Sequence, residues 1–541
     1  MRVLGVEGTA WCASAAVFDA ETDSVFIESD PYEPDSGGIH PREAAEHMGD
    51  AVPRVIRTAL EHARTAYDDR DGDQPPVDAV AFSRGPGLGP CLRVVATAAR
   101  ALAQTLDVPL VGVNHMVAHL EIGRHRAGFD SPVCLNASGA NAHLLGFQDG
   151  RYRVLGETMD TGVGNALDKF TRHVGWSHPG GPKIESHATD GEFAELPYVV
   201  KGMDFSFSGI MSAAKDAYDD GVPVEDVCFS LQEHVFAMLT EVTERALSLT
   251  GTDELVLGGG VGQNQRLREM LASMCAERGA DFHAPEPRFL RDNAGMIAVL
   301  GAKMAAAGDT VAVADSAIDP DFRPDQVPVT WRDSAESVAR VPGSDDDAAD
   351  LRGAEATVEV AGDDVVKRRL PKAYRHPDLD ATLRRERTVA EARLLAAARR
   401  AGVPTPLVRD VDVAEATLTM QFVGERDLAA ALTVDHARAV GEHLARLHGE
   451  GIVHGDPTTR NVRVGRHDGN ERRFLIDFGL GFQSDHVEDY AMDLHVFAQS
   501  VEGTAAAPAP LVEAVEAGYR AVGDEAVLER LRGVEGRGRY R

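Results

Sequence analysis

Short β-type runs alternate with helical hydrophobic patterns from Met1 to about Phe322, and this alternation constrains the fold more than any other feature of the sequence. Such an order of elements is typical of a layered α/β domain. Strands are expected at Val3–Val6, Ala13–Phe18, Ala79–Phe82, Leu110–Val113, Val133–Asn136, Leu144–Phe147 and Leu255–Leu257. Helices are expected at Ala44–Ala66, Arg93–Leu106, Asp226–Thr250, Gln265–Arg278 and Asp292–Ala307.

Two of the expected strand pairs are predicted to form β-hairpins with small residues at their turns. The first spans Val3–Phe18 around Glu7-Gly8-Thr9, and the second spans Val133–Phe147 around Ser138-Gly139-Ala140. A hairpin at the head of each half indicates a duplicated fold with a cleft between the halves.

The alternating pattern breaks between residues 325 and 349, where the polar, acidic stretch Val341–Asp347 has the composition of a linker. A chain of 541 residues also exceeds what one hydrophobic core usually serves. We therefore predict a first domain at 1–324, an acidic linker at 325–349 and a second domain at 350–541. The second domain is expected to be mostly helical after its first elements, which are strands at Ala356–Val360 and Asp364–Arg369, an Arg-rich helix at Leu379–Ala401 and a β-like island at Leu475–Asp477.

The excess of acidic over basic residues indicates the habitat of the organism rather than the kind of ligand that the protein binds. Asp and Glu number 86 against 55 Lys and Arg, and Lys occurs only at Lys169, Lys183, Lys201, Lys215, Lys303, Lys367 and Lys372. An acidic, Lys-poor surface suits the salt-rich cytosol of a halophilic archaeon, where salt screens charge repulsion. The five Cys residues form no C-x-x-C pair, and the sequence contains no signal segment or membrane-spanning run, so a cytoplasmic protein is expected.

Two short motifs near the C-terminus have the spacing of a protein-kinase catalytic centre. His454-Gly455-Asp456 precedes Asn461, and Ile476-Asp477-Phe478-Gly479 follows. Phosphoryl transfer requires oxygen ligands for Mg²⁺, which Asn461 and Asp477 supply, and a carboxylate near the incoming hydroxyl, which Asp456 supplies. Each motif alone also fits a chance turn, and their joint spacing favours the kinase interpretation.

An upstream Lys and Glu complete the expected ATP site. Lys367 lies on a strand and is expected to hold phosphates, with Glu391 as its partner in the Arg-rich helix. No glycine-rich G-x-G-x-x-G loop is present, and no A-P-E motif follows Gly479. The segment in the loop's place is Leu351, Arg352, Gly353, Ala354, Glu355 and Ala356.

A pair of histidines in the first domain is a candidate metal site. His115 and His119 are four residues apart, so a helix places both on one face, where they can bind one metal ion. A structural or solvent-facing pair has the same spacing. The position directly after His115 is Met116, whereas a metalloprotease requires Glu there as its general base.

Two Gly-containing turns and one Asp extend this candidate site. Ser138-Gly139-Ala140-Asn141 and Leu257–Asn264 are turns where a nucleotide can approach backbone N–H groups, although a Gly run is equally suited to a plain tight turn. Asp292 precedes the last helix of the domain, where an N-cap is the commonest use of such an Asp.

The first domain carries a family resemblance in a series of short stretches that follow one another in the family's order. These stretches are Gly5–Ala10, His40–Ala44, Gly85–Gly89, Asn114–Leu120, Asp160–Lys169, Pro179–Pro182, Phe205–Gly209, Gly258–Asn264 and Asp292-Asn293. Residues 1–324 resemble the archaeal and eukaryotic enzymes that make N6-threonylcarbamoyladenosine in tRNA, once labelled O-sialoglycoprotein endopeptidases. The resemblance implies an α/β actin-like fold of the acetate/sugar-kinase–Hsp70–actin superfamily, with duplicated RNase H-like halves.

The resemblance also implies roles for individual residues. It implies that His115, His119 and Asp292 are the ligands of one Fe²⁺ or Zn²⁺. The family usually has a Tyr as a further metal ligand, and this chain has Asn136 at that position. Water or substrate is therefore expected to fill the coordination position of the Tyr. His40 and Glu43 are candidates for a general base. The residues implied around the adenylate are Asn136, Ala137, Ser138, Gly139, Ala140, Asp168, Gly181, Glu185 and Asn264.

The implied reaction transfers the threonylcarbamoyl group of threonylcarbamoyl-AMP to N6 of the adenosine next to the anticodon of tRNAs that read ANN codons. The C-terminal half resembles the atypical RIO-like serine/threonine protein kinase of the KEOPS complex, with a minimal α+β kinase fold that binds ATP and Mg²⁺ and regulates or resets the transferase. Small KEOPS subunits are the implied partners: a dimerising subunit on the transferase and a regulator on the kinase.

Two other functions remain open from the residues alone. One is a metalloendopeptidase with an attached regulatory kinase. The other is a non-catalytic scaffold that binds ATP to organise its partners.

Overall fold

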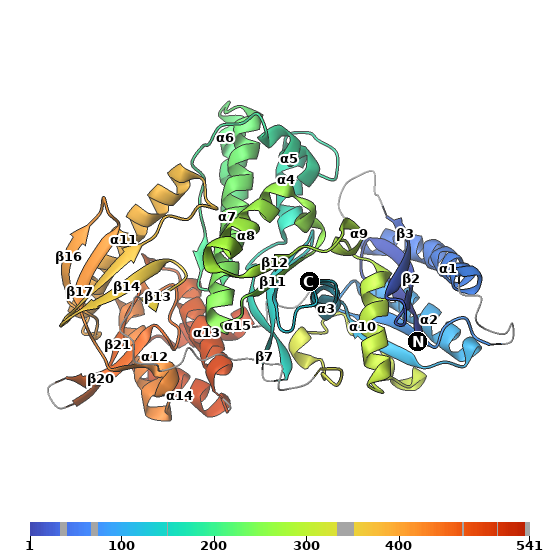
Figure 1. Ribbon diagram of the computed structural model, residues 1–541. Helices are drawn as coiled ribbons and strands as arrows, with labels where there is room; N and C mark the ends of the chain where they lie inside the picture. The colour runs from blue at the N-terminus through green and yellow to red at the C-terminus, as the bar shows by residue number, and fades with distance from the viewer. Residues whose placement is uncertain are drawn as a thin grey trace. The chain divides into compact units, whose positions relative to one another are not determined.

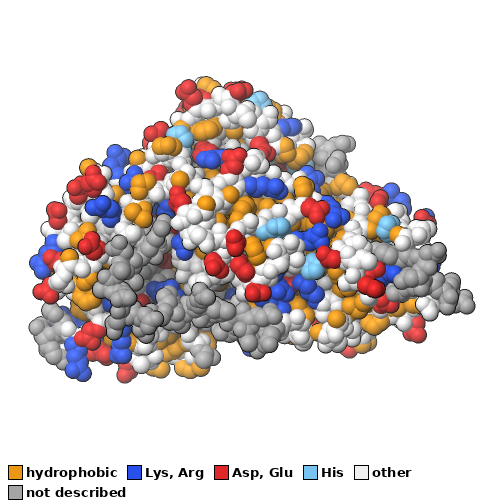
Figure 2. Space-filling view, in the orientation of Figure 1, with side chains coloured by type: hydrophobic (Ala, Val, Ile, Leu, Met, Phe, Trp, Pro, Cys, Tyr) orange, Lys and Arg blue, Asp and Glu red, His pale blue; other side chains and the backbone are white. Residues whose placement is uncertain are grey.

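The computed structural model describes residues 1–32, 40–66, 74–148, 150–332, 351–467, 470–505 and 507–535 (Figure 1). The chain divides into two units, of which the first contains the described residues of 1–198 and 206–343 and the second those of 199–205 and 344–539. Acidic and basic side chains are interspersed on the face shown in Figure 2. None of the helices in these described segments is long and apolar enough to cross a membrane.

Two five-stranded sheets organise the first unit. The first has the order β3-β2-β1-β4-β5 and the second β12-β11-β6-β7-β8. The first contains β1 (Arg2–Glu7), β2 (Cys12–Asp19), β3 (Ser24–Pro31), β4 (Ala79–Gly85) and β5 (Leu110–Asn114). The second contains β6 (Val133–Ala137), β7 (Ala142–Gln148), β8 (Arg151–Glu157), β11 (Glu254–Gly258) and β12 (Asp281–His283).

The two sheets repeat one topology. In each, three consecutive strands pair antiparallel, a later strand pairs parallel with the first of the three, and a further strand pairs parallel with that later strand. The two hairpins predicted from the sequence, β1–β2 and β6–β7, stand at the same place in the two sheets. This repetition is what a duplicated fold requires.

Helices cover both sheets of the first unit. They are α1 (Pro41–Ala66), α2 (Gly89–Leu106), α3 (His115–Ala127), α4 (Val163–His173), α5 (Gly181–Ala188), α6 (Ser208–Asp219), α7 (Val224–Thr250), α8 (Gln265–Arg278), α9 (Pro287–Leu290) and α10 (Ala294–Ala306), with short 3-10 turns at Gly260–Gln263, Val313–Asp315 and Pro324–Gln326. Helices α1 and α2 share one apolar core with the first sheet. A second core joins α3 and α10 to strands of both sheets, so these two helices lie between the sheets.

Close packing fixes the start of α10 against β1. A Cβ added at Gly5 in β1 would lie 2.4 Å from the carbonyl oxygen of Ala294, the first residue of α10. Because no real side chain tolerates that distance, Gly at position 5 lets the helix approach the strand. The residues just before α10 are thereby held beside the β1–β2 hairpin.

The second unit begins with an antiparallel sheet of order β13-β14-β15-β17-β16. Its strands are β13 (Leu351–Arg352), β14 (Ala356–Ala361), β15 (Asp364–Arg369), β16 (Val408–Asp412) and β17 (Thr417–Gln421), and α11 (Pro377–Arg400) separates β15 from β16. The remaining helices are α12 (Val434–Gly449), α13 (Val487–Thr504), α14 (Ala509–Arg520) and α15 (Glu525–Glu535).

Small sheets complete the second unit. One contains β18 (Arg426–Asp427), β20 (Val462–His467) and β21 (Asn470–Leu475), and another pairs β19 (Ile452–Val453) with β22 (Phe482–Gln483). The hairpin of β9 (Val200–Lys201) and β10 (Asp204–Phe205) also belongs to this unit.

Several sequence expectations are corrected. The second unit was expected to be mostly helical after its first elements, and β16 to β22 add strands that are only two to six residues long; charged residues in β16, β18, β20 and β21 further mask a β pattern. The expected β island at Leu475–Asp477 is the end of β21, which stops at Leu475. Strands β3, β8 and β12 were not expected; the first two form the outer antiparallel edge of each sheet.

The predicted linker at 325–349 lies largely outside the described residues, which resume at 351. Its first part belongs to the first unit, where Val327 is buried in the core and Arg332 donates a hydrogen bond to the carbonyl oxygen of Asp130 at 2.7 Å. The domain limits of 1–324 and 350–541 stay a prediction.

Candidate functional site

Helix α3 carries the predicted histidine pair. Asn114 caps the helix, because its side-chain oxygen accepts a hydrogen bond from the backbone N–H of Val117 at 3.0 Å. His115 is therefore the first helical residue, and His119 follows one turn later on the same side. His115 is 7% exposed and His119 is 2% exposed, so the pair is not solvent-facing.

Asp292 is not the N-cap of the following helix. The side chain of Asn293 fills that role and accepts a hydrogen bond from the N–H of Met296 at 3.1 Å. Helix α10 consequently starts at Ala294 rather than at the expected Asp292. This correction leaves the carboxylate of Asp292 available for another partner.

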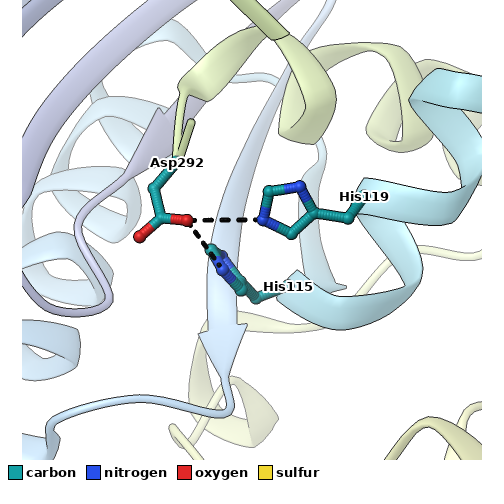
Figure 3. Close-up of side chains that lie close together, drawn as sticks. All are labelled: His115, His119 and Asp292. Carbon is teal, nitrogen blue, oxygen red and sulfur yellow. Dashed lines mark hydrogen bonds and ion pairs between the residues drawn. The ribbon is translucent and has the colours of Figure 1, made fainter. Parts of the chain in front are cut away.

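The two histidines and Asp292 converge on one point (Figure 3). Oδ1 of Asp292 lies 3.4 Å from Nε2 of His115 and 3.3 Å from Nε2 of His119. These three residues can hold a metal ion, since one ligand atom from each lies within 4.8 Å of the other two.

Burial and mutual contacts shift the pKa values of His115, His119 and Asp292, which together are called the triad below. Burial lowers the pKa of His115, but the carboxylates of Glu7 and Asp292 more than offset this and raise the pKa to about 10. Burial lowers the pKa of His119 below its ordinary value. Burial raises the pKa of Asp292, but the two histidines have a stronger opposite effect and hold it well below its usual range. The ionised carboxylate of Asp292 thus pairs with a protonated His115, and a metal ion bound by the site would replace the Nε2 proton of that histidine.

The donor set fits a first-row divalent metal. Imidazole nitrogen and carboxylate oxygen bind Zn²⁺ or Fe²⁺ at about 2.0–2.2 Å, so neighbouring ligand atoms of a tetrahedral site lie about 3.3–3.6 Å apart. The observed separations of 3.3 and 3.4 Å between Oδ1 of Asp292 and the two Nε2 atoms agree with that spacing.

Two further residues of the β1–β2 hairpin contact the triad. Nδ1 of His115 lies 3.1 Å from Oε2 of Glu7, and the indole N–H of Trp11 donates to Oδ2 of Asp292 at 3.0 Å. Neither Glu7 nor Trp11 was predicted from the sequence to belong to the site. A Glu directly after the apolar run Val3–Val6 was the signal for Glu7, whereas Trp11 gave no signal.

Asn136 contacts His143, its partner across the β6–β7 hairpin. Nδ2 of Asn136 lies 3.5 Å from Nε2 of His143, which is fully buried. Burial, followed by repulsion from His119 and His115, lowers the pKa of His143 to about 3, so the ring is neutral. The sequence analysis did not single out His143.

The turn predicted to meet the adenylate connects β6 to β7. The N–H of Ser138 donates to the carbonyl oxygen of Asn141 at 2.9 Å, which closes the turn that also contains Gly139 and Ala140. The carbonyl oxygen of Gly139 accepts from the N–H of Asn165 at the start of α4. Ala137, which ends β6 before this turn, is fully buried.

Three other predicted adenylate residues anchor loops of the first unit. Oδ1 of Asp168 accepts from the N–H of Gly180 at 2.7 Å, just before Gly181 opens α5. Oε1 of Glu185 accepts from the N–H of Gln265 at 2.8 Å. Asn264 caps α8, accepting from the N–H of Leu267 at 3.2 Å.

The candidate base residues lie at the start of α1. His40 immediately precedes the helix, and Glu43 accepts a hydrogen bond from the hydroxyl of Tyr32 at 2.6 Å. Neither residue belongs to the triad, and their role as a base stays a prediction.

The second unit brings the predicted Lys, Glu and Asp together. Nζ of Lys367 lies 3.0 and 3.1 Å from the two carboxylate oxygens of Glu391 and 2.7 Å from Oδ1 of Asp477. Burial raises the pKa of Asp477, but Lys367 and then Arg369 lower it to about 2. The buried Arg369 also pairs with Glu391, which the sequence analysis did not anticipate.

The other predicted kinase residues form a second contact. Nδ2 of Asn461 donates to Oδ2 of Asp456 at 3.1 Å and to its backbone oxygen at 2.9 Å. Asp493 accepts from the N–H groups of His454 at 2.6 Å and Gly455 at 2.8 Å, which holds the segment just before Asp456 in place.

The segment in place of a glycine-rich loop is a tight turn between β13 and β14. The N–H of Gly353 donates to the carbonyl oxygen of Ala356 at 2.9 Å. Ala354 accepts from Lys372, and Glu355 accepts from Arg387. The side chains of the two preceding residues, 351 and 352, lie outside what the structure describes.

Comparison with known proteins identifies the first unit. Residues 22–299, just over half of the chain, match the family TsaD, described as tRNA N6-adenosine threonylcarbamoyltransferase. A protein of Halobacterium salinarum is 72% identical over 100% of this chain and 99% of its own length, and one of Haloquadratum walsbyi is 67% identical over 100% of both chains. A protein of Methanosarcina acetivorans is 47% identical over 99% of both. All three are named "Probable bifunctional tRNA threonylcarbamoyladenosine biosynthesis protein". This chain belongs to the TsaD family of tRNA N6-adenosine threonylcarbamoyltransferases.

Proposed function

We propose that this bifunctional protein makes N6-threonylcarbamoyladenosine by transferring the threonylcarbamoyl group of threonylcarbamoyl-AMP to the adenosine next to the anticodon of tRNAs that read ANN codons. Family membership supports the transfer reaction and the tRNA acceptor. The observation that carries the proposal is the buried convergence of His115, His119 and Asp292.

These three side chains would hold one metal ion, for which we propose Fe²⁺ with Zn²⁺ as the alternative. When bound there, such an ion would supply Lewis-acid polarisation of the carbamoyl carbonyl group. The reaction forms a bond between N6 of adenosine and the carbamoyl carbon. The bond from that carbon to the phosphate oxygen breaks, AMP departs with the bonding electrons, and the amine loses a proton. The chain contributes buried ligands, since His115 and His119 are 7% and 2% exposed.

The AMP part is proposed to bind along Asn136–Ala140, Asp168, Gly181, Glu185 and Asn264. The hydrogen bonds of Asp168 and Glu185 support this placement only indirectly: they occupy the N–H groups of Gly180 and Gln265 and so hold the backbone at the starts of α5 and α8, where the N–H groups that follow would face the phosphate. Backbone N–H groups at helix starts favour phosphate. The actin-like fold expected from the sequence is consistent with the repeated sheet topology of the unit.

For the second unit we propose an atypical, RIO-like serine/threonine kinase or ATPase that binds ATP and Mg²⁺. The ion pairs of Lys367 with Glu391 and Asp477 support an ATP site, and Asp456 beside Asn461 supports a catalytic base next to a Mg²⁺ ligand. The proposed role of this unit is to regulate or reset the transferase.

The proposed setting is the cytoplasm of a halophilic archaeon. Small KEOPS subunits are the proposed partners, with a dimerising subunit on the transferase and a regulator on the kinase. The acidic, Lys-poor composition supports the salt-rich setting.

The test is complementation of a strain depleted of this chain, followed by mass spectrometry of nucleosides from its tRNA. The unaltered chain should restore N6-threonylcarbamoyladenosine, and His119→Ala and Asp292→Asn should not. His125→Asn is the matched control, since His125 lies on the same helix but pairs with the exposed Asp23. Full restoration by His119→Ala would contradict the proposed site.

Two further experiments test the alternative functions, a metalloendopeptidase and a scaffold. Cleavage of a glycoprotein by the purified chain, without base modification in cells, would favour a metalloendopeptidase. Asp456→Asn tests the second unit: we expect it to lower the modification level, and an unchanged level would favour a scaffold role for that unit.

A further inference from the structure

Two residues of the β1–β2 hairpin contact the triad residues His115 and Asp292, each through the atom that points away from the other triad residues. Glu7, the last residue of β1, faces Nδ1 of His115, which is the ring nitrogen opposite to the one directed at Asp292. Trp11, directly before β2, faces Oδ2 of Asp292, which is the oxygen opposite to the one directed at the histidines. Both contacts therefore leave the converging atoms free.

Glu7 is itself fixed by neighbours that donate hydrogen bonds. Its side chain is fully buried. Oε1 accepts from the N–H of Thr9 at 2.8 Å, and Oε2 accepts from the hydroxyl of Ser83 on β4. A carboxylate can only accept hydrogen bonds, so the contact at 3.1 Å requires a proton on Nδ1 of His115. With its Nδ1 proton held by Glu7, the ring can bind a metal only through Nε2, where the ion would take the place of the second proton.

Trp11 fixes the orientation of the carboxylate in a corresponding way. An indole N–H is a donor only, so the contact at 3.0 Å occupies Oδ2 of Asp292 with a hydrogen bond. Oδ1 then remains directed at both imidazoles. The third ligand has no such support in the described part of the chain, where Nδ1 of the buried His119 has no hydrogen-bond partner.

We infer that the β1–β2 hairpin is the positioning element of the metal site, with Glu7 fixing the tautomer of His115 and Trp11 fixing the rotation of Asp292. Both are positioning residues that act through the ligands. Outer partners of this kind typically contribute 10- to 100-fold to metal affinity. The inference rests on the metal site proposed above.

A purely structural role of the same contacts is the competing explanation. Under that explanation Glu7 only closes the hairpin turn through Thr9 and ties β1 to β4 through Ser83. Its replacement would then lower the melting temperature without a specific effect on metal binding. Trp11→Phe separates the two explanations more cleanly, because it keeps an aromatic ring at this position, though a smaller one, and removes the N–H donor to Asp292.

The experiment measures Zn²⁺ affinity of the full-length chain by competition with a chromophoric chelator, together with the visible absorption spectrum of the Co²⁺ form. The variants are Glu7→Gln and Trp11→Phe, and circular dichroism monitors their thermal unfolding. Glu21→Gln is the matched control, because Glu21 is an exposed residue beyond the other end of β2.

We expect roughly 10- to 100-fold weaker Zn²⁺ binding for Glu7→Gln and roughly 10-fold weaker binding for Trp11→Phe, with altered Co²⁺ spectra and an unchanged control. If Glu7→Gln fails to fold, the result with Trp11→Phe decides. Unaltered affinity and spectrum in the folded variants, or an equal loss in the control, would overturn the inference. Absence of Zn²⁺ and Co²⁺ binding by the unaltered chain would instead refute the metal site itself.

Discussion

Glu121 lies on α3, two residues after His119, and its replacement by Gln tests how the metal-binding helix is held. Its carboxylate is fully buried and forms ion pairs with Arg124 at 2.9 Å, Lys303 at 2.9 Å and Arg332 at 3.4 Å. The hydroxyl of Tyr152 also donates to it at 2.6 Å. Glu121→Gln would leave these cations together without their common anion.

The pKa of Glu121 sets the magnitude of the effect. Burial raises this pKa, but Lys303 and Arg124, followed by Arg332, lower it to about 2 from the ordinary 4.5. Such a carboxyl stabilises the folded state by about 3 kcal/mol at neutral pH. The contribution is complete above the unfolded-state pKa and is lost as the pH falls through the folded-state pKa, so about 1.5 kcal/mol remains near pH 3.

Tryptophan fluorescence during urea unfolding measures this effect in the full chain. All three Trp residues, at positions 11, 176 and 331, lie in the first unit, so their emission reports on that unit alone. Arg54→Met is the control: Arg54 is 62% exposed and pairs with Asp30, and exposed pairs contribute less than about 1 kcal/mol. A loss below about 1 kcal/mol for Glu121→Gln at neutral pH, or a loss that does not shrink toward pH 3, would refute the reasoning.

Three further outcomes are expected. Gly5→Ala should destabilise the first unit by roughly 1–3 kcal/mol, measured by tryptophan fluorescence, because its Cβ would clash with the carbonyl of Ala294; an unchanged urea midpoint would contradict this. Burial lowers the pKa of His443 to about 4, so the second unit should lose stability as the pH falls from about 6.5 to 4, and His443→Gln should flatten this dependence in circular dichroism. Lys367→Met should weaken binding of a fluorescent ATP analogue at least about 10-fold, whereas Arg409→Met, which removes an exposed pair, should leave it unchanged; equal affinities would argue against the ATP site.

Elements with clear boundary signals were predicted closely from the sequence. Helix α8 was expected at Gln265–Arg278 and occupies those residues, because Asn264 caps its start and Gly279 ends it in a left-handed conformation. Strand β3 was missed because it is an outer strand with half-exposed, acidic residues and lacks a clean alternation.

The residues of the candidate site likewise divide into those that the sequence could indicate and those that it could not. The spacing of His115 and His119 is local, so the sequence could indicate that pair. The contact of Glu7 with His115 spans 108 residues and that of Trp11 with Asp292 spans 281, and only the folded sheets bring these residues together. At positions 292 and 293 the sequence offers two adjacent cap-forming side chains, and tertiary packing decides which one faces the helix.

The most direct test of the account is anomalous X-ray diffraction from crystals of the metal-loaded full chain, recorded at the absorption edge of the bound metal. The account predicts one strong peak in the first unit, about 2.0–2.2 Å from Nε2 of His115, Nε2 of His119 and Oδ1 of Asp292. A protein that retains stoichiometric metal but shows its peak away from these three atoms would contradict the account.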